Sequence, residues 1–298
     1  MHIDQLPSFA DRLSVLRQRK DRVLAVCAGL AVGALGALGM LAAPTTAYAG
    51  PLDLRFGGFV GNTPTDNKVK SAGLNSLVRE LTFAIGPHMG GPVHSGGALG
   101  VDVGYEFTSA GVNAGESYWK TATSQPQDNI GVHTLRMRKG LPHSIQLGTS
   151  VSHVSDSNLY TLGAEVQASL LDGFRAIPDV GVRMGVQAVM GNPEADIVAA
   201  GFDGIVSKSF GIGGVLALQP WVGYQLGLAY ANVRNQPIAK TSQAGPPDVR
   251  QFAQIYQTSN RMALGVRVVA ARVQAGVELH RSITDAQNAL TFKVGAVF

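Results

Sequence analysis

Apolar and polar side chains alternate along most of the chain from residue 96 to its last residue, Phe298. Between Leu99 and Phe107 every second residue is apolar, whereas the intervening residues are glycine or acidic. Successive side chains of a β-strand point to opposite faces, so this pattern predicts a strand with one apolar and one polar face. Runs of the same kind, separated by turn-forming residues, predict a chain built mostly of β-strands.

The runs number ten, and each is long for a strand. A strand that crosses a bilayer needs about 9–11 residues, whereas strands of soluble domains cluster near about 5–6 residues. The lengths therefore favour a membrane protein over a soluble exported β-protein. Boundaries predicted in this way carry errors of a few residues, so eight or twelve strands stay open as alternatives. The predicted strands are 97–109, 130–138, 144–153, 159–170, 179–190, 197–210, 215–230, 261–269, 272–280 and 290–298.

The charged residues of these strands fall on the polar faces, opposite valine, leucine, alanine, methionine and aromatic residues. A transmembrane barrel turns apolar side chains to lipid and polar ones to its lumen. A sheet exposed to lipid cannot leave an unpaired edge, so the last strand must pair with the first. We therefore predict an all-β fold, a closed antiparallel up-and-down transmembrane β-barrel of about 10 strands spanning residues 96–298. The expected lumen-lining residues are Asp102, Glu106, Arg136, Arg138, Glu165, Arg183, Arg261, Arg267, Arg272, Glu278 and Lys293.

The lengths of the connections are unequal on the two sides of the predicted barrel. If the first strand starts from the periplasm, the two longest connections, 110–128 and 231–260, lie on the outer side. The connections of the periplasmic side are all short, and they are 139–142, 171–178, 211–214 and 270–271. Outer-membrane barrels show this asymmetry.

Residues 1–49 have the pattern of a cleaved export signal. Basic residues at 12–22 precede an apolar run at 23–43, and Ala47-Tyr48-Ala49 matches the small-x-small cleavage pattern. An uncleaved anchor helix is the alternative, because this apolar run is longer than the usual signal core. The only cysteine, Cys27, lies in the same segment, so the exported chain is expected to contain no disulfide.

The segment 50–95 differs from the rest. Residues 52–61 could form a strand, whereas 62–73 is polar and rich in turn-forming residues. Apolar residues of 74–86 recur at roughly helical spacing, and Gly86-Pro87 is a stop signal, so we predict an amphipathic helix there. This helix could plug the lumen, lie on the periplasmic face of the membrane, or be a misread strand.

The composition agrees with an apolar environment. Charged residues make up 15% of the chain, below the roughly 25% of an ordinary soluble domain. Residues 1–49 hold five basic and three acidic side chains, so the remainder carries 19 minus 17, or +2. This small excess gives no reason to expect nucleic acid as a partner. The histidines are scattered without metal-ligand spacing, and no phosphate-binding loop is present, so neither a metal nor a cofactor is expected.

With these features the chain resembles a Gram-negative outer-membrane β-barrel protein, of a family without an assigned reaction. The segments RELTFAIGP and GIVSKSF are similar to parts of uncharacterised predicted barrels. The resemblance implies localisation in the outer membrane, contact with its lipid, and a terminal strand that the barrel assembly machinery recognises. The residues that would carry this assembly signal are Phe292, Val294, Ala296 and Phe298.

The lumen charges allow two functions. A barrel of about ten strands has little space beyond its side chains, which favours a closed or narrow lumen and a structural or surface-interaction role for a monomer. The alternative is a porin-like channel for small solutes, with a lean towards anions because basic candidates outnumber acidic ones.

Enzymatic activity is the least favoured function. An outer-membrane protease or lipid-modifying enzyme would need a complete catalytic motif, and the nearest match is only His153 followed by Asp156. The long outer connections, with Tyr118 and Trp119 in the first, are candidates for ligand binding.

Overall fold

A computed structural model describes residues 50–59, 64–88, 90–94, 96–174, 176–233, 254–285 and 287–298, with the backbone alone for 64–70. The predicted signal peptide and most of the predicted outer connection 231–260 lie outside these residues. The helical elements are the 3-10 turn η1 (Gly57–Phe59), α2 (Pro64–Ile85) and α3 (Ser117–Ala122). None of the described helices is both long and apolar enough to cross a membrane.

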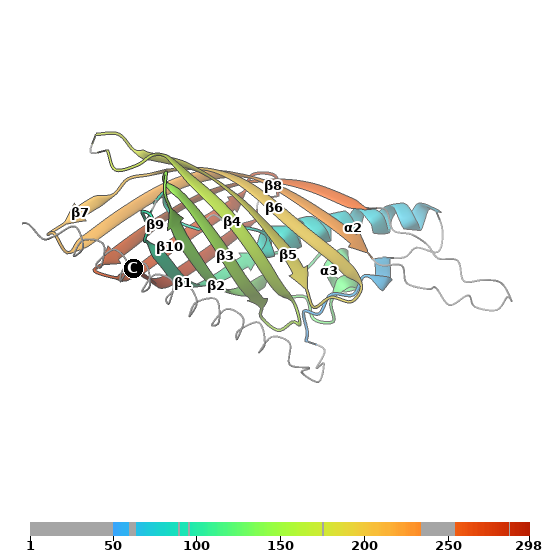
Figure 1. The fold of residues 1–298 in the computed structure, drawn as a ribbon. Coiled ribbons are helices and arrows are strands. Elements are labelled where there is room, and N and C mark those ends of the chain that lie inside the picture. The colour runs from blue at the N-terminus through green and yellow to red at the C-terminus, as the bar shows by residue number, and fades with distance from the viewer. Residues whose placement is uncertain are drawn as a thin grey trace, which may run out of the picture. The chain divides into compact units, whose positions relative to one another are not determined.

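The strands form one antiparallel sheet that closes on itself (Figure 1). They are β1 (Val101–Gly111), β2 (Asn129–Leu141), β3 (Ile145–Val154), β4 (Tyr160–Leu171), β5 (Asp179–Met190), β6 (Ala195–Ser207), β7 (Phe210–Ile212), β8 (Leu216–Val233), β9 (Ile255–Ala270), β10 (Val273–Ser282) and β11 (Asn288–Val297). Strands that are neighbours in sequence pair with each other, except that β6 pairs with β8 instead of the short β7, which pairs with β8 alone. The first strand β1 pairs with β11 from Asp102↔Val297 to Ala110↔Ala289. The ten predicted strands are confirmed, and the closure of first on last strand is confirmed with them.

The two ends of the barrel differ in their connections. We call the end that carries residues 112–128, 155–159, 191–194 and 283–287 the loop end. The turn end carries residues 142–144, 172–178 and 271–272, and the carboxy-terminal Phe298 lies there beside Val101. In Figure 1, α2 and α3 lie towards the loop end, whereas β7 and the carboxy terminus lie towards the turn end.

The outer surface of the barrel is apolar. Leu135, Leu147, Met184, Leu228 and Leu264 are among many large hydrophobic side chains that are exposed along the strands. The intervening positions are buried and largely polar, as in β2, where Thr134, Arg136 and Arg138 follow at every second residue. This distribution is the one that a barrel in lipid requires.

Three details differ from the sequence-based expectations. The helix starts at Pro64 instead of residue 74, because proline fits the first turn of a helix, where its missing N–H has no partner to lose. Residues 52–61 form no strand in their described part, since the N–H groups of Leu52 and Arg55 bond to the carbonyls of Asp156 in a turn and of Ala122 at the end of α3. The segment 211–214 is part of a hairpin between the short β7 and β8, with Gly213 and Gly214 at positive φ.

Candidate functional site

The carboxy-terminal half of α2 lies inside the loop end of the barrel. Leu74, Leu77, Val78, Leu81 and Ile85 are buried on this helix. They belong to one apolar cluster together with inward-facing residues of the strand ends, among them Ala110, Ile130, Val154, Ile197, Ala231, Ile255 and Ala289. These strand residues come from seven different strands around the circumference. Of the three placements considered for the helix, the structure therefore has the one inside the lumen.

The helix ends against a cation of the barrel wall. Its last residue, Ile85, precedes Gly86 and Pro87, and a proline cannot extend the helical hydrogen bonding. Arg261 of β9 donates from Nη2 to the carbonyl of Phe83 at 3.3 Å, and its guanidinium lies 4.7 Å from the centre of the Phe83 ring. A cation near the last carbonyls of a helix stabilises the negative end of its dipole.

Beyond α2 the chain continues through the lumen towards the turn end. Arg138 of β2 donates to the carbonyl of Gly90, and Ser207 of β6 accepts the N–H of Val93 at 3.1 Å. A Cβ atom at Gly90 would collide with Nη2 of Arg138, so glycine is what allows this close approach. Nε2 of Gln167 on β4 lies 3.4 Å from the carbonyl of His94. We call residues 74–94 the lumen segment.

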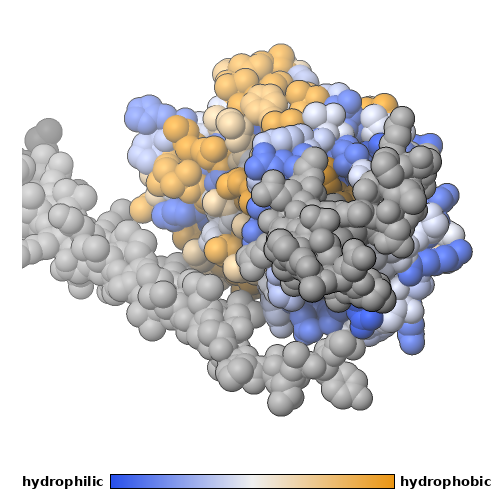
Figure 2. Space-filling view, turned by 90° about the vertical axis from the view of Figure 1, so that its right-hand side faces the viewer, coloured by the Kyte–Doolittle hydropathy of each residue, from blue (hydrophilic) through white to orange (hydrophobic). Residues whose placement is uncertain are grey.

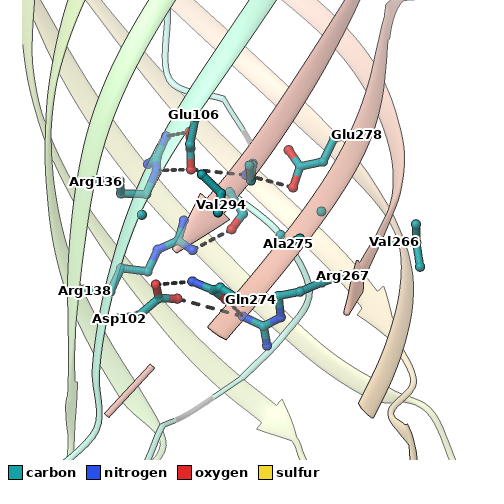
Figure 3. A pocket seen from close by; sticks show the side chains of 15 residues that line it. Asp102, Glu106, Arg136, Arg138, Val266, Arg267, Gln274, Ala275, Glu278 and Val294 are labelled. Carbon is teal, nitrogen blue, oxygen red and sulfur yellow. Dashed lines mark hydrogen bonds and ion pairs between the residues drawn. The ribbon is translucent and has the colours of Figure 1, made fainter. Parts of the chain in front are cut away.

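An ion network lies on the barrel wall beside the part of the lumen segment that is nearer the turn end, and Figure 3 shows part of it. Arg136 binds Glu106 with two hydrogen bonds of 2.9 and 3.1 Å and also binds Glu165. Lys293 lies 3.3 Å from Glu106 and 2.8 Å from Glu278. All five side chains are at least 85% buried, so each charge depends on its partners for stabilisation.

The contact between Arg138 and Glu165 spans two strand spacings. Arg138 on β2 is paired with Gly148 on β3, and Gly148 is paired with Glu165 on β4. A Cβ atom at Gly148 would lie 2.6 Å from Cγ of Glu165. Because Gly148 has no side chain, Nε of Arg138 reaches Oε1 of Glu165 across it at 2.5 Å.

Two smaller groups of polar side chains also line the lumen. Gln274 donates to Asp102, and Arg267 donates to Gln219 at 2.6 Å. On the opposite wall, Arg183 binds Asp203 at 2.8 Å, and Gln225 donates to the same carboxylate. The cavity between Gly90, Arg136, Arg267 and Lys293 measures about 30 Å³, which holds about two water molecules.

A buried carboxylate joins the lumen segment to the connection between β1 and β2. Glu80 of α2 accepts hydrogen bonds from the indole of Trp119 at 2.7 Å, the hydroxyl of Tyr118 at 2.6 Å, and the backbone and side-chain amides of Asn113. Burial and the hydrogen bond to Glu80 raise the pKa of Tyr118 above its ordinary value. The expectation that Trp119 is available for ligands is wrong, because it is 1% exposed in the apolar cluster.

Residues 50–59, which we call the cap segment, are bound to several connections of the loop end. Asp53 accepts hydrogen bonds from the backbone and side-chain amides of Asn158 at 2.7 and 3.0 Å. Glu194 accepts the backbone N–H groups of Phe56 and Gly57. Asn192 donates to the carbonyl of Leu54 at 3.1 Å. The cap segment thus contacts the connections at 112–128, 155–159 and 191–194.

The structure places all but one of the expected lumen residues in these contacts. Arg272 is the exception and is a correction, because it occupies the tight turn between β9 and β10 and is exposed there. Four further residues that are not among the expected lumen residues are also buried in the lumen, namely Asp203, Gln225, Gln274 and Glu80. Asp203 lies between the exposed Phe202 and Gly204 of β6, and this alternation was a usable signal.

The residues of the expected assembly signal lie on the outer face of the last strand. Phe292, Val294 and Phe298 are exposed, Phe298 by 64%, and Ala296 is partly exposed. Val101 and Phe298 exchange two backbone hydrogen bonds, of 2.8 and 3.0 Å, which extend the seam between β1 and β11.

The spacing of His153 and Asp156 does not produce a catalytic pair in this structure. Nε2 of His153 lies 3.1 Å from the carbonyl of Ser157, and its ring packs on Tyr160 with centroids 4.7 Å apart. Asp156 is at a positive φ of 56° in the turn that follows β3. These contacts fit a hairpin end.

The closed sheet, its apolar outer face and its polar interior define the fold of an outer-membrane β-barrel. Similar solved structures include Ail, the attachment invasion locus protein of Yersinia pestis, with 12% identity over 67% of this chain and 99% of that chain and a TM-score of 0.26. They also include the KdgM porin (10% identity, 66% and 99% coverage, TM-score 0.30) and the N-terminal β-barrel domain of Pseudomonas aeruginosa OprF (15%, 68% and 99%, 0.28). No protein-family model matches the chain, and neither does any curated protein.

Proposed function

We propose that the protein is a monomeric outer-membrane barrel with a closed lumen and a structural or surface-interaction role, and that it catalyses no reaction. The observation that carries this proposal is the lumen segment. It occupies the barrel from the apolar cluster at the loop end to the ion network nearer the turn end.

A channel would need a continuous polar path from one end to the other. At the loop end the interior is apolar, with Leu77, Val78 and Phe83 buried against the strand ends. Nearer the turn end, Arg136 and Lys293 form ion pairs with carboxylates, and the cavity beside them has a volume of about 30 Å³. Neither region supports passage of a hydrated solute.

The alternative of a small-solute channel is favoured by one observation, the charged lining of the lumen. Among the described strand residues that face the lumen, the basic ones are Arg136, Arg138, Arg183, Arg261, Arg267 and Lys293, and the acidic ones are Asp102, Glu106, Glu165, Asp179, Asp203 and Glu278. If the lumen segment left the barrel, these charges would line a polar path through it.

Planar-bilayer recording separates the two functions. We expect the full mature chain to give no stable open steps, whereas a chain lacking residues 50–94 should give them. Stable conductance of the full chain would contradict the closed lumen, and a silent deletion variant would contradict the role of the lumen segment. Gel mobility with and without boiling verifies the folding of each variant. If the deletion prevents folding, Leu77→Asp/Leu81→Asp serves instead, because it places two charges in the apolar cluster.

Localisation is tested by fractionating the native cells. We expect the protein in the outer-membrane fraction, with a heat-modifiable band and an amino terminus generated by cleavage after Ala49. Recovery in the periplasm without heat modification would end the proposal.

The barrel assembly machinery is the partner proposed for the last strand. Deleting Phe298 should reduce insertion into the outer membrane and leave export across the inner membrane unchanged, because the exposed aromatic end would be lost. Pulse-chase fractionation measures both steps, and Arg272→Ala at the same end of the barrel is the control. Insertion of the truncated chain at the wild-type rate would contradict this role of Phe298.

A further inference from the structure

The chain runs through the barrel in a definite direction. The cap segment is bound at the loop end, through Asp53 to Asn158 and through Glu194 to Phe56 and Gly57. Residues 90–94 are bound to Arg138, Ser207 and Gln167 in the part of the lumen that is nearer the turn end. The connection to β1 then reaches the turn end, where Lys139 lies 3.0 Å from the carbonyl of Ala98. From residue 50 to residue 101 the chain therefore passes from the loop end to the turn end.

The lumen is the only route between these two ends for this segment. The sheet is closed by β1–β11 and β6–β8 pairing, so the segment cannot pass between strands. Its buried residues contact inward-facing side chains of the wall, which excludes a path along the outer surface. The segment crosses the thickness of the barrel once, in addition to the ten strands.

We infer that the cap segment is displayed on the cell surface and that the lumen segment is the tether by which the barrel carries it across the outer membrane. This inference rests on the proposed membrane location, with the loop end outside. A chain exported into the periplasm has to move residues 50–59 across the outer membrane to reach their binding sites at the loop end.

The contacts at the loop end are those of a site that receives the cap segment. Three connections contribute to it. The connection 191–194 binds through the carboxylate of Glu194 and the amide of Asn192, 155–159 through the carbonyl of Asp156 and the amides of Asn158, and 112–128 through the carbonyl of Ala122. Phe56 and Phe59 of the cap segment are buried in the same apolar cluster as the helix. Figure 2, a view onto this end, shows hydrophilic residues over much of the visible surface, with hydrophobic residues gathered towards the top and left. The visible hydrophilic surface at this end of the barrel is consistent with exposure to water.

The test uses single cysteines and a maleimide attached to a polymer too large to cross the outer membrane. Cys27 is the only cysteine of the chain, and Cys27→Ser removes any labelling from it. The probe position is Arg55→Cys, because Arg55 is exposed in the cap segment. Glu116→Cys marks the loop end and Ala176→Cys marks the turn end, and both residues are exposed.

In intact cells we expect Arg55→Cys and Glu116→Cys to be labelled, and Ala176→Cys only after the outer membrane is permeabilised. Protection of Arg55→Cys in cells where Glu116→Cys is labelled would overturn the surface display and leave the barrel itself intact. Labelling of Ala176→Cys with protection of Glu116→Cys would overturn the orientation and the proposed function with it. If Arg55→Cys lacks a heat-modifiable band, Ala72→Cys on α2 is the second probe, since Ala72 is exposed as well.

Discussion

The two halves of the lumen hold the same segment by different physical means. At the loop end, α2 is held by apolar packing of residues such as Leu77 and Leu81, with Glu80 as its main buried polar anchor. Nearer the turn end, residues 90–94 of the segment carry few large apolar groups. There the barrel wall binds the backbone of the segment through hydrogen bonds from Arg138 and to Ser207. Packing tolerates adjustments of shape, whereas a buried charge without its partner is strongly unfavourable. The ionic half should therefore be the more sensitive to single substitutions.

The largest effect is expected for Arg136→Met. The substitution leaves Glu106 and Glu165 buried without their shared guanidinium, and removal of one member of a buried ion pair costs about 3–5 kcal/mol. Equilibrium unfolding by denaturant in detergent micelles, followed by circular dichroism, measures the free energy of unfolding. Arg272→Met is the matched control, because Arg272 is exposed in a turn, and it should change little. A smaller loss for Arg136→Met than for the apolar substitution below would contradict the comparison.

The apolar half is tested by Leu77→Ala. Leu77 is 0% exposed in the apolar cluster, and truncation of a buried leucine costs about 2–5 kcal/mol. Trp119 lies in the same cluster, so its fluorescence should report the loosening directly. Leu99→Ala is the control, since Leu99 is 69% exposed near the turn end. Equal destabilisation by the two variants would show that the helix is not packed as described.

These substitutions also mark what the sequence could and could not predict. Alternation of apolar and polar residues predicts strands and places charges such as Glu106 and Arg136 on the lumen face, because a strand has a period of two. Alternation carries no information on which charges meet across non-adjacent strands. The pair Arg138–Glu165 depends on the register of β2, β3 and β4, which long-range pairing decides.

The helix shows the same limit. Its apolar spacing predicts a buried face, but the partner of that face comes from seven strands that are distant in sequence. The bonds of Glu80 to Tyr118 and Trp119 likewise join residues 38 and 39 positions apart. The expectation that Arg272 lines the lumen fails for a simpler reason. The strand β10 begins one residue later than expected, at Val273, so Arg272 lies in the turn before it.

A moderate effect is expected for Gly148→Ala, which tests the contact across β3. The added methyl group would lie 2.6 Å from Cγ of Glu165 and would separate Arg138 from its carboxylate. Crowding a packed interior costs about 1–3 kcal/mol, and the same unfolding experiment measures it. Gly204→Ala is the control, because a Cβ atom there has open space around it. If both alanine variants are equally stable, the network does not depend on the gap at Gly148.

The smallest effect is expected for Tyr118→Phe, and its pH dependence identifies the bond to Glu80. The raised pKa of Tyr118 means that the folded state keeps the phenolic proton more tightly than the unfolded state does. The contribution of the Tyr118 hydroxyl to the free energy of unfolding is therefore complete below the ordinary tyrosine pKa of about 10. It is lost as the pH rises through the higher pKa of Tyr118 in the folded state. The difference in unfolding free energy between wild type and Tyr118→Phe should shrink above about pH 10, where the unfolded tyrosine ionises. Tyr256→Phe is the control, because Tyr256 is 70% exposed. A difference that stays constant with pH would place the contribution of Tyr118 in its ring packing instead of its hydroxyl.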